Sequence, residues 1–144
     1  MMTAQRRSAW SIAGSAALVL ALAGCASNDV VDVLSTAVNL PAVGVTAQGL
    51  GFTVVAREFT FEQTYSSPTE GDSLDVGLAV TNFRAGSVLI EIRDAGGVAR
   101  YQQTLTSGIA QGQATVAGTP PYTVHLRFTG FSAVFALGVA AHGP

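Results

Sequence analysis

The sequence predicts an all-β domain over residues 51–144: an antiparallel β-sandwich, Ig-like or jelly-roll-like, with about seven or eight short strands. Three observations predict this fold. Apolar residues alternate with polar or small ones in several segments, which is the period of a strand with one buried face. Clusters of turn-forming residues separate these segments at short intervals. Connections this short leave no room for a crossover helix, so neighbouring strands run antiparallel.

Four segments alternate most clearly, namely Leu74–Val80, Val88–Arg93, Tyr122–Phe128 and Phe131–Val139. Side chains two residues apart on a strand point to the same face, so each segment offers one apolar face to a core. In the third segment, for example, Tyr122 and Val124 alternate with Thr123. Weaker strands fit residues 52–57, 59–64, 99–106 and 113–117.

Glycine, proline, serine and aspartate mark the expected turns between these strands. The turns fall at residues 66–68, 84–86, 94–97, 107–108, 118–121 and 129–130. The last of them, Thr129-Gly130, predicts a closing hairpin in which Phe128 and Phe131 pair and face the core.

Composition excludes several kinds of function. With 144 residues, of which 49% are hydrophobic and 11% charged, the chain can form one domain with a packed core. A formal charge of −2 and the absence of lysine argue against nucleic-acid binding, Schiff-base chemistry and a P-loop. The single cysteine, Cys25, allows neither an internal disulfide nor a Cys-rich zinc site. We therefore expect no cofactor and no metal.

The first 25 residues have the three parts of an export signal. Arg6 and Arg7 form a positive start, and Trp10–Leu22 is an uncharged apolar run, too short to span a bilayer comfortably. Leu22-Ala23-Gly24-Cys25 follows. This stretch resembles the lipobox of bacterial lipoprotein precursors.

The resemblance implies that residues 1–24 are a signal peptide and that the Cys25 thiol carries diacylglycerol, with an acyl chain such as palmitate on the new amine. The lipid would hold the protein in the cell envelope. Ala26, where an aspartate often causes retention in the inner membrane, favours the outer membrane of a two-membrane bacterium. Residues 25–50 would then be a tether. Within it, Val30–Val38 has apolar residues at helical spacing until Pro41, so either a short helix or an irregular linker fits.

Gly71-Asp72-Ser73-Leu74 spells the signature of the GDSL serine hydrolases. In that family the serine leads into a helix, and further blocks supply an oxyanion hole and an aspartate three residues before a histidine. Here residues 66–70, which precede the motif, are rich in residues that break strands and helices. The residues after the motif alternate as in a strand rather than a helix. Tyr122 and Val139 stand three residues before the two histidines. We expect a turn that leads into a strand, and no enzyme.

His125 and Arg127 share the outward face of one predicted strand. They are candidate ligand-binding residues for an anionic group or a sugar, although such residues often simply solvate an exposed sheet face. Tyr65, Tyr101 and Tyr122 are possible platforms for sugar stacking. The strand pattern places Tyr122 in the core instead.

Carboxylates also gather near the predicted turns. They are Glu70, Asp72, Asp75 and Asp94. Loops rich in oxygen ligands at one end of a sandwich can hold calcium, but this spacing fits no EF-hand, and aspartate is a common turn residue.

The second face of the last predicted strand is small and apolar rather than charged. It carries Ser132, Val134, Ala136, Gly138 and Ala140. Either a segment of the chain itself covers this face, such as residues 30–38, or a partner does. In the second case Val134 and Ala136 are the partner surface.

These inferences predict a lipid-anchored protein of the cell envelope, a non-catalytic binding or assembly module with a protein partner there. A carbohydrate- or calcium-binding β-sandwich is the alternative. A hydrolase that uses Ser73 is a second alternative, which the missing supporting motifs disfavour.

Overall fold

The computed structural model describes residues 38–142, and these fold as an all-β, antiparallel structure without a helix, which confirms the predicted fold class. The strands are β1 (Ala42–Thr46), β2 (Gly49–Ser67), β3 (Ser73–Arg93), β4 (Ala99–Leu105), β5 (Ile109–Ala117) and β6 (Tyr122–Ala141). Residues 42–50, which the sequence analysis assigned to the tether, form β1 and the start of β2. Within the described range no helix is long and apolar enough to cross a membrane.

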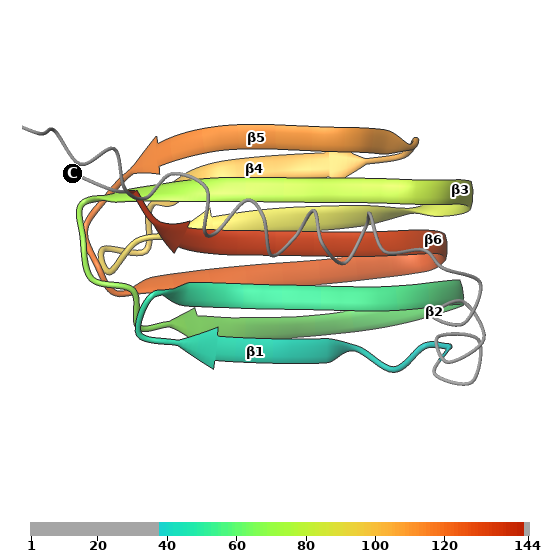
Figure 1. The fold of residues 1–144 in the computed structure, drawn as a ribbon, viewed down its shortest axis with the longest axis horizontal. Coiled ribbons are helices and arrows are strands. Elements are labelled where there is room, and N and C mark those ends of the chain that lie inside the picture. The colour runs from blue at the N-terminus through green and yellow to red at the C-terminus, as the bar shows by residue number, and fades with distance from the viewer. Residues whose placement is uncertain (1–37, 143–144) are drawn as a thin grey trace, which may run out of the picture.

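Three long strands fold over and so divide one hydrogen-bonded sheet into two layers. The strand order is β1-β2-β6-β3-β4, and β5 also pairs with β3. Strands β2, β3 and β6 span 19, 21 and 20 residues, and each doubles back at the right-hand end of Figure 1.

We name the layers by their position in Figure 1. The front layer holds β1, β5 and residues 49–56, 73–81 and 131–141 of the long strands. The rear layer holds β4 and residues 59–67, 87–93 and 122–129. The sheet order is therefore that of a sandwich whose layers are joined at one end.

The corners between the layers are built from left-handed backbone and register shifts. Positive φ angles occur at Glu58 (50°), Asn82 (53°), Gly86 (85°) and Gly130 (52°), and the pairing shifts register at the corners of β2 and β3. A Cβ at Gly86 would lie 2.3 Å from the carbonyl oxygen of Gly130. Only glycine fits there, because both the dihedral angle and the close backbone approach exclude a side chain.

The corners correct two predicted turns. Residues 84–86 and Thr129-Gly130 do not join separate short strands but lie inside β3 and β6, and β6 forms no hairpin with itself. The six strands replace the expected seven or eight because three of them serve both layers. Phe128 and Phe131 are both fully buried, as the alternation predicts, but they follow one another around a corner.

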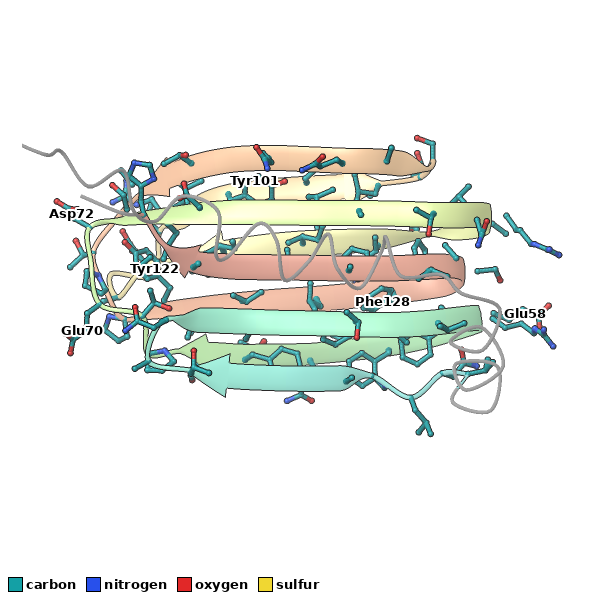
Figure 2. All side chains as sticks on the ribbon, in the orientation of Figure 1. Glu58, Glu70, Asp72, Tyr101, Tyr122 and Phe128 are labelled. Carbon is teal, nitrogen blue, oxygen red and sulfur yellow. The ribbon has the colours of Figure 1, made fainter. Side chains whose placement is uncertain are left out.

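Phe128 lies in the core, toward the corner end of the sandwich (Figure 2). Its ring centroid is 5.7 Å from that of Phe52, 5.3 Å from that of Phe59 and 5.2 Å from that of Phe135. Phe52 and Phe135 belong to the front layer and Phe59 to the rear layer, so the cluster joins the two. The predicted core residues Tyr122, Val124 and Leu126 are also fully buried, as the alternation requires.

A polar cluster closes the opposite end of the sandwich. The Tyr122 hydroxyl, which can donate only one hydrogen bond, lies 3.0 Å from the carbonyl oxygen of Gly71 and 2.9 Å from that of Gly118. The buried Asp94 carboxylate accepts hydrogen bonds from Arg100 Nε at 2.6 Å and from the N–H groups of Gly96 and Val98 at 3.0 Å. Every oxygen of this buried group therefore has a donor.

The hydrogen bond from Arg100 lowers the pKa of Asp94 below its ordinary value of 3.8, and the backbone donors add to this against the opposing effect of burial. A carboxyl whose pKa is depressed by folding stabilises the native state above its unfolded pKa. This contribution disappears as the pH falls through the lower, folded pKa.

Asp94→Asn is expected to reduce stability at neutral pH and to remove this part of the acid sensitivity. The neutral amide has only one acceptor oxygen. Its NH₂ group therefore faces either Arg100 or the backbone N–H groups of the turn, and those donors lose their acceptor. Urea unfolding between pH 7 and pH 2 measures both effects. Glu70→Gln, at an exposed acid of the same end of the sandwich, is the control. Parallel acid sensitivity in wild type and Asp94→Asn would contradict the prediction.

Candidate functional site

The outer face of the rear layer is a polar surface that crosses four strands. Its residues alternate with the core residues of the same strands. Register places two rows across it. One row is Thr64, His125, Glu91 and Gln102, and the next is Glu62, Arg127, Leu89 and Thr104. Residues that lie far apart in the chain thus form one continuous surface.

His125 is held between two neighbours on β2. Its Nε2 lies 3.2 Å from Glu62 Oε1, and its Nδ1 lies 2.9 Å from Thr64 Oγ1. A neutral imidazole satisfies both contacts when Nε2–H donates to Glu62 and Nδ1 accepts from the Thr64 hydroxyl. The ring is 26% exposed, so it is oriented by the protein but still reaches solvent.

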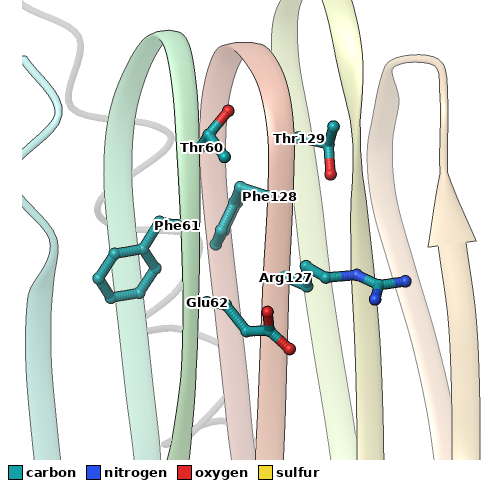
Figure 3. A pocket seen from close by; sticks show the side chains of 6 residues that line it. All are labelled: Thr60, Phe61, Glu62, Arg127, Phe128 and Thr129. Atoms are coloured by element: carbon teal, nitrogen blue, oxygen red, sulfur yellow. The ribbon is translucent and has the colours of Figure 1, made fainter.

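A shallow hollow of about 220 Å³ lies beside this histidine, near the corner of the layer (Figure 3). It is lined by Thr60, Phe61, Glu62, Arg127, Phe128 and Thr129. Small-molecule pockets usually measure roughly 300–1,000 Å³, so the hollow is a contact surface rather than an enclosed site.

The hollow combines donors, acceptors and an apolar wall. Glu62 and Arg127 reach it from neighbouring strands, and Phe61 lies half-buried at its side. Arg127 is exposed and makes no ion pair with any residue from 38 to 142. Its N–H groups therefore face solvent ready to donate.

The structure brings the predicted residues His125 and Arg127 to one surface, as their alternation indicates. Glu62, Thr64 and Phe61 could not be predicted as site residues, because nothing in the local sequence shows that residues 59–67 pair with residues 122–131. The alternation of Phe59 and Phe61 with polar residues is the signal that marks this strand.

The other predicted site residues lie elsewhere. Val134 and Ala136 are half-buried on the outer face of the front layer. Cys25 lies outside the described residues. Asp94 is paired with Arg100. No group of three or more potential metal ligands occurs within residues 38–142.

Ser73 begins β3 directly after a turn in which Gly71 has a φ of 129°. The fold brings His142 to this strand. Its side-chain Nδ1 lies 2.8 Å from Asp75 Oδ1, and its backbone N–H donates a hydrogen bond to the carbonyl oxygen of Ser73. The sequence spacing does not reveal this pair, since residues 75 and 142 meet only through the pairing of β3 with β6. Asp75 and His142 are each about half exposed.

The geometry lacks the link that catalysis by Ser73 needs. A serine nucleophile requires a base within hydrogen-bond reach of its hydroxyl. Within the described part of the chain, no hydrogen bond joins Ser73 Oγ to His142, and Asp75 Oδ1 also accepts one from Thr115. The cluster is a hydrogen-bonded group on the surface at the end of the sheet.

The protein is expected to hydrolyse short-chain p-nitrophenyl esters no faster than its Ser73→Ala and His142→Ala variants do. A spectrophotometric assay at matched protein concentration tests this. Thr115→Ala, which removes another hydroxyl that contacts Asp75, is the control. Activity that disappears with Ser73→Ala and His142→Ala but survives Thr115→Ala would contradict the prediction.

No protein-family model and no curated protein matches the chain. Among solved structures it is similar to TmCBM61 in complex with β-1,4-galactotriose, at 13% identity and a TM-score of 0.40, over 64% of this chain and 68% of that one. It is also similar to a CBM4 structure, at 13% identity and a TM-score of 0.35, over 67% and 82% of the two chains. A third likeness is to carbohydrate-binding modules of the β-sandwich superfamily, at 12% identity and a TM-score of 0.36, over 70% and 51%.

Proposed function

We propose that the protein is a carbohydrate-binding module held at the cell envelope, and that the hollow between Glu62 and Arg127 is the centre of its binding surface. The observation that carries this proposal is the composition of that hollow. It sets an acidic and a basic side chain, two threonines and two phenylalanines around one depression. The preformed position of His125 extends the surface along the same strands.

Sugar hydroxyl groups both donate and accept hydrogen bonds, so their binding sites need partners of both kinds. Glu62 accepts, Arg127 donates and the Thr129 hydroxyl does both. The planar guanidinium can engage two oxygens of one sugar at once. The exposed part of Phe61, whose ring stacks on Phe59 with the centroids 5.2 Å apart, supplies an apolar surface for the C–H side of a sugar ring. The shallow shape suits a chain of sugars that passes over the face rather than a ligand that enters it.

Attachment to the envelope is the second part of the proposal and rests on the lipobox-like residues before Cys25. Each buried methylene of a lipid stabilises membrane attachment by about 0.8 kcal/mol, and two or more acyl chains give a stable anchor. A module anchored in this way is held close to the polysaccharides of the cell surface. In this proposal the lipid anchor determines where the protein is held, and the outer face of the rear layer determines which ligand it binds.

Arg127→Ala is expected to weaken binding to a soluble polysaccharide at least ~10-fold, because a hydrogen bond to a charged group contributes about 1.5–3 kcal/mol. Glu62→Gln is expected to weaken it as well. Affinity electrophoresis against a panel of neutral and uronic-acid polysaccharides identifies the ligand, and titration calorimetry then measures the affinity.

The matched control for this experiment is Arg57→Ala, at an exposed arginine beside the β2 corner that does not line the hollow. It should leave binding unchanged. Retention of wild-type affinity by Arg127→Ala, or failure of every polysaccharide to bind the wild-type protein, would contradict the proposal.

Cys25→Ala is expected to move the protein from the membrane to the soluble fraction. The wild type should carry the mass of a diacylglyceryl group on Cys25, and intact-mass spectrometry of both fractions measures it. Ala26→Ser, one residue further on, is the control and should stay in the membrane. An unmodified Cys25 in a soluble wild-type protein would refute the anchor and leave the sugar-binding surface to be judged separately.

A further inference from the structure

The outer face of the front layer has the opposite chemistry to that of the rear layer. Four glycines are direct neighbours across four strands: Gly44 on β1, Gly51 on β2, Gly138 on β6 and Gly77 on β3. A Cβ added at Gly44, Gly51 or Gly77 would meet nothing within 4 Å. Strands lie about 4.8 Å apart, so this glycine row is an open strip about 14 Å wide.

On the side toward the corner, the rows beside the glycines are also small and uncharged, whereas the row on the other side contains Asp75 between Ala140 and Thr115. The adjacent row is Ala42, Thr53, Ala136 and Ala79, and the one beyond it is Val55, Val134 and Thr81. The corresponding rows of the rear layer contain Glu62, Glu91, His125 and Arg127. Glycine weakens a strand and often marks a place where another backbone or a ligand approaches closely. Four of them in one row therefore indicate that something lies against this face.

The described chain enters beside this face. Asn39 N–H donates to the carbonyl oxygen of Val55 at 2.8 Å, and its side chain bonds the backbone N–H and C=O of Arg57 at 2.8 and 2.9 Å. These bonds fix the start of the described chain at the corner end of the front layer. Val134 pairs with Val55 and so lies in the same row.

We propose that residues 30–38 form a helix that docks on the outer face of the front layer, from the corner to the glycine row. Their apolar residues Val30, Val33, Leu34, Ala37 and Val38 recur at the spacing of one helix side. Asp32 falls on the opposite side, toward solvent, and Asp29 directly precedes the helix. The occupant is thus this chain's own N-terminal segment.

The lengths agree with this docking. A nine-residue helix is about 13 Å long, and the four-residue step along β6 from Val134 to Gly138 also measures about 13 Å. A helix that ends just before Asn39, whose φ is 61°, therefore begins above the glycine row. The missing side chains there let its valines approach the sheet backbone closely. The inference depends neither on the lipid nor on a sugar ligand.

A double-mutant cycle in the full chain, purified in detergent, tests the proposal. Gly77→Val should lower the urea midpoint, because the added side chain occupies the space into which the helix packs. In a Val33→Asp, Leu34→Asp background the helix no longer docks, and the same Gly77→Val change should be neutral or should raise the midpoint, since valine favours a strand more than glycine does.

Disulfide trapping gives a second, independent readout. In a Cys25→Ala chain, Leu34→Cys should form an intramolecular disulfide with Ala136→Cys but not with Thr123→Cys on the outer face of the rear layer. An equal effect of Gly77→Val in both backgrounds, together with no preference in trapping, would overturn the proposal. A dimer in sedimentation velocity that Gly77→Val dissociates would also overturn it, since the occupant would then be a second copy. If residue 136 crosslinks to another envelope protein instead of to residue 34, the proposal is wrong and the occupant is a partner protein.

Discussion

The fold-over of the three long strands is the constraint on which the rest of the structure depends. Each strand serves both layers, so the layers cannot separate without breaking the strands' corners. Gly86 and Gly130 make this possible, because the backbone of one corner lies against that of the other where no side chain fits. Phe128, just before the corner of β6, then packs against phenylalanines from both layers.

The corners also create two outer faces of different character from the same strands. Along β6 the outward residues are odd-numbered up to Thr129 and even-numbered from Ser132, because the corner at Gly130 shifts the alternation by one residue. The first half of the strand places His125 and Arg127 outward in the rear layer. The second half places Val134 and Ala136 outward in the front layer. One face suits a polar ligand, and the other suits an apolar segment.

The alternation of apolar residues predicts most of the core and the outward position of His125 and Arg127. It does not distinguish a corner from a hairpin, because Gly130 at positive φ serves either, and only the pairing of β6 with both β2 and β3 separates the two. The partners of His125 cannot be predicted from the local sequence for the same reason. Glu62 and Thr64 are more than sixty residues away in the chain and meet it only through sheet register. The Asp75–His142 pair is likewise a product of register.

We propose that a carbohydrate contacts the outer face of the rear layer. The most direct measurement is a backbone NMR titration of the wild-type protein with the polysaccharide that retards it in affinity electrophoresis. We predict that the shifting amides cluster at residues 60–64 and 125–129, on the two strands that flank the hollow. Shifts that cluster instead at the glycine row of the front layer, or at the edge of β5, would contradict the account.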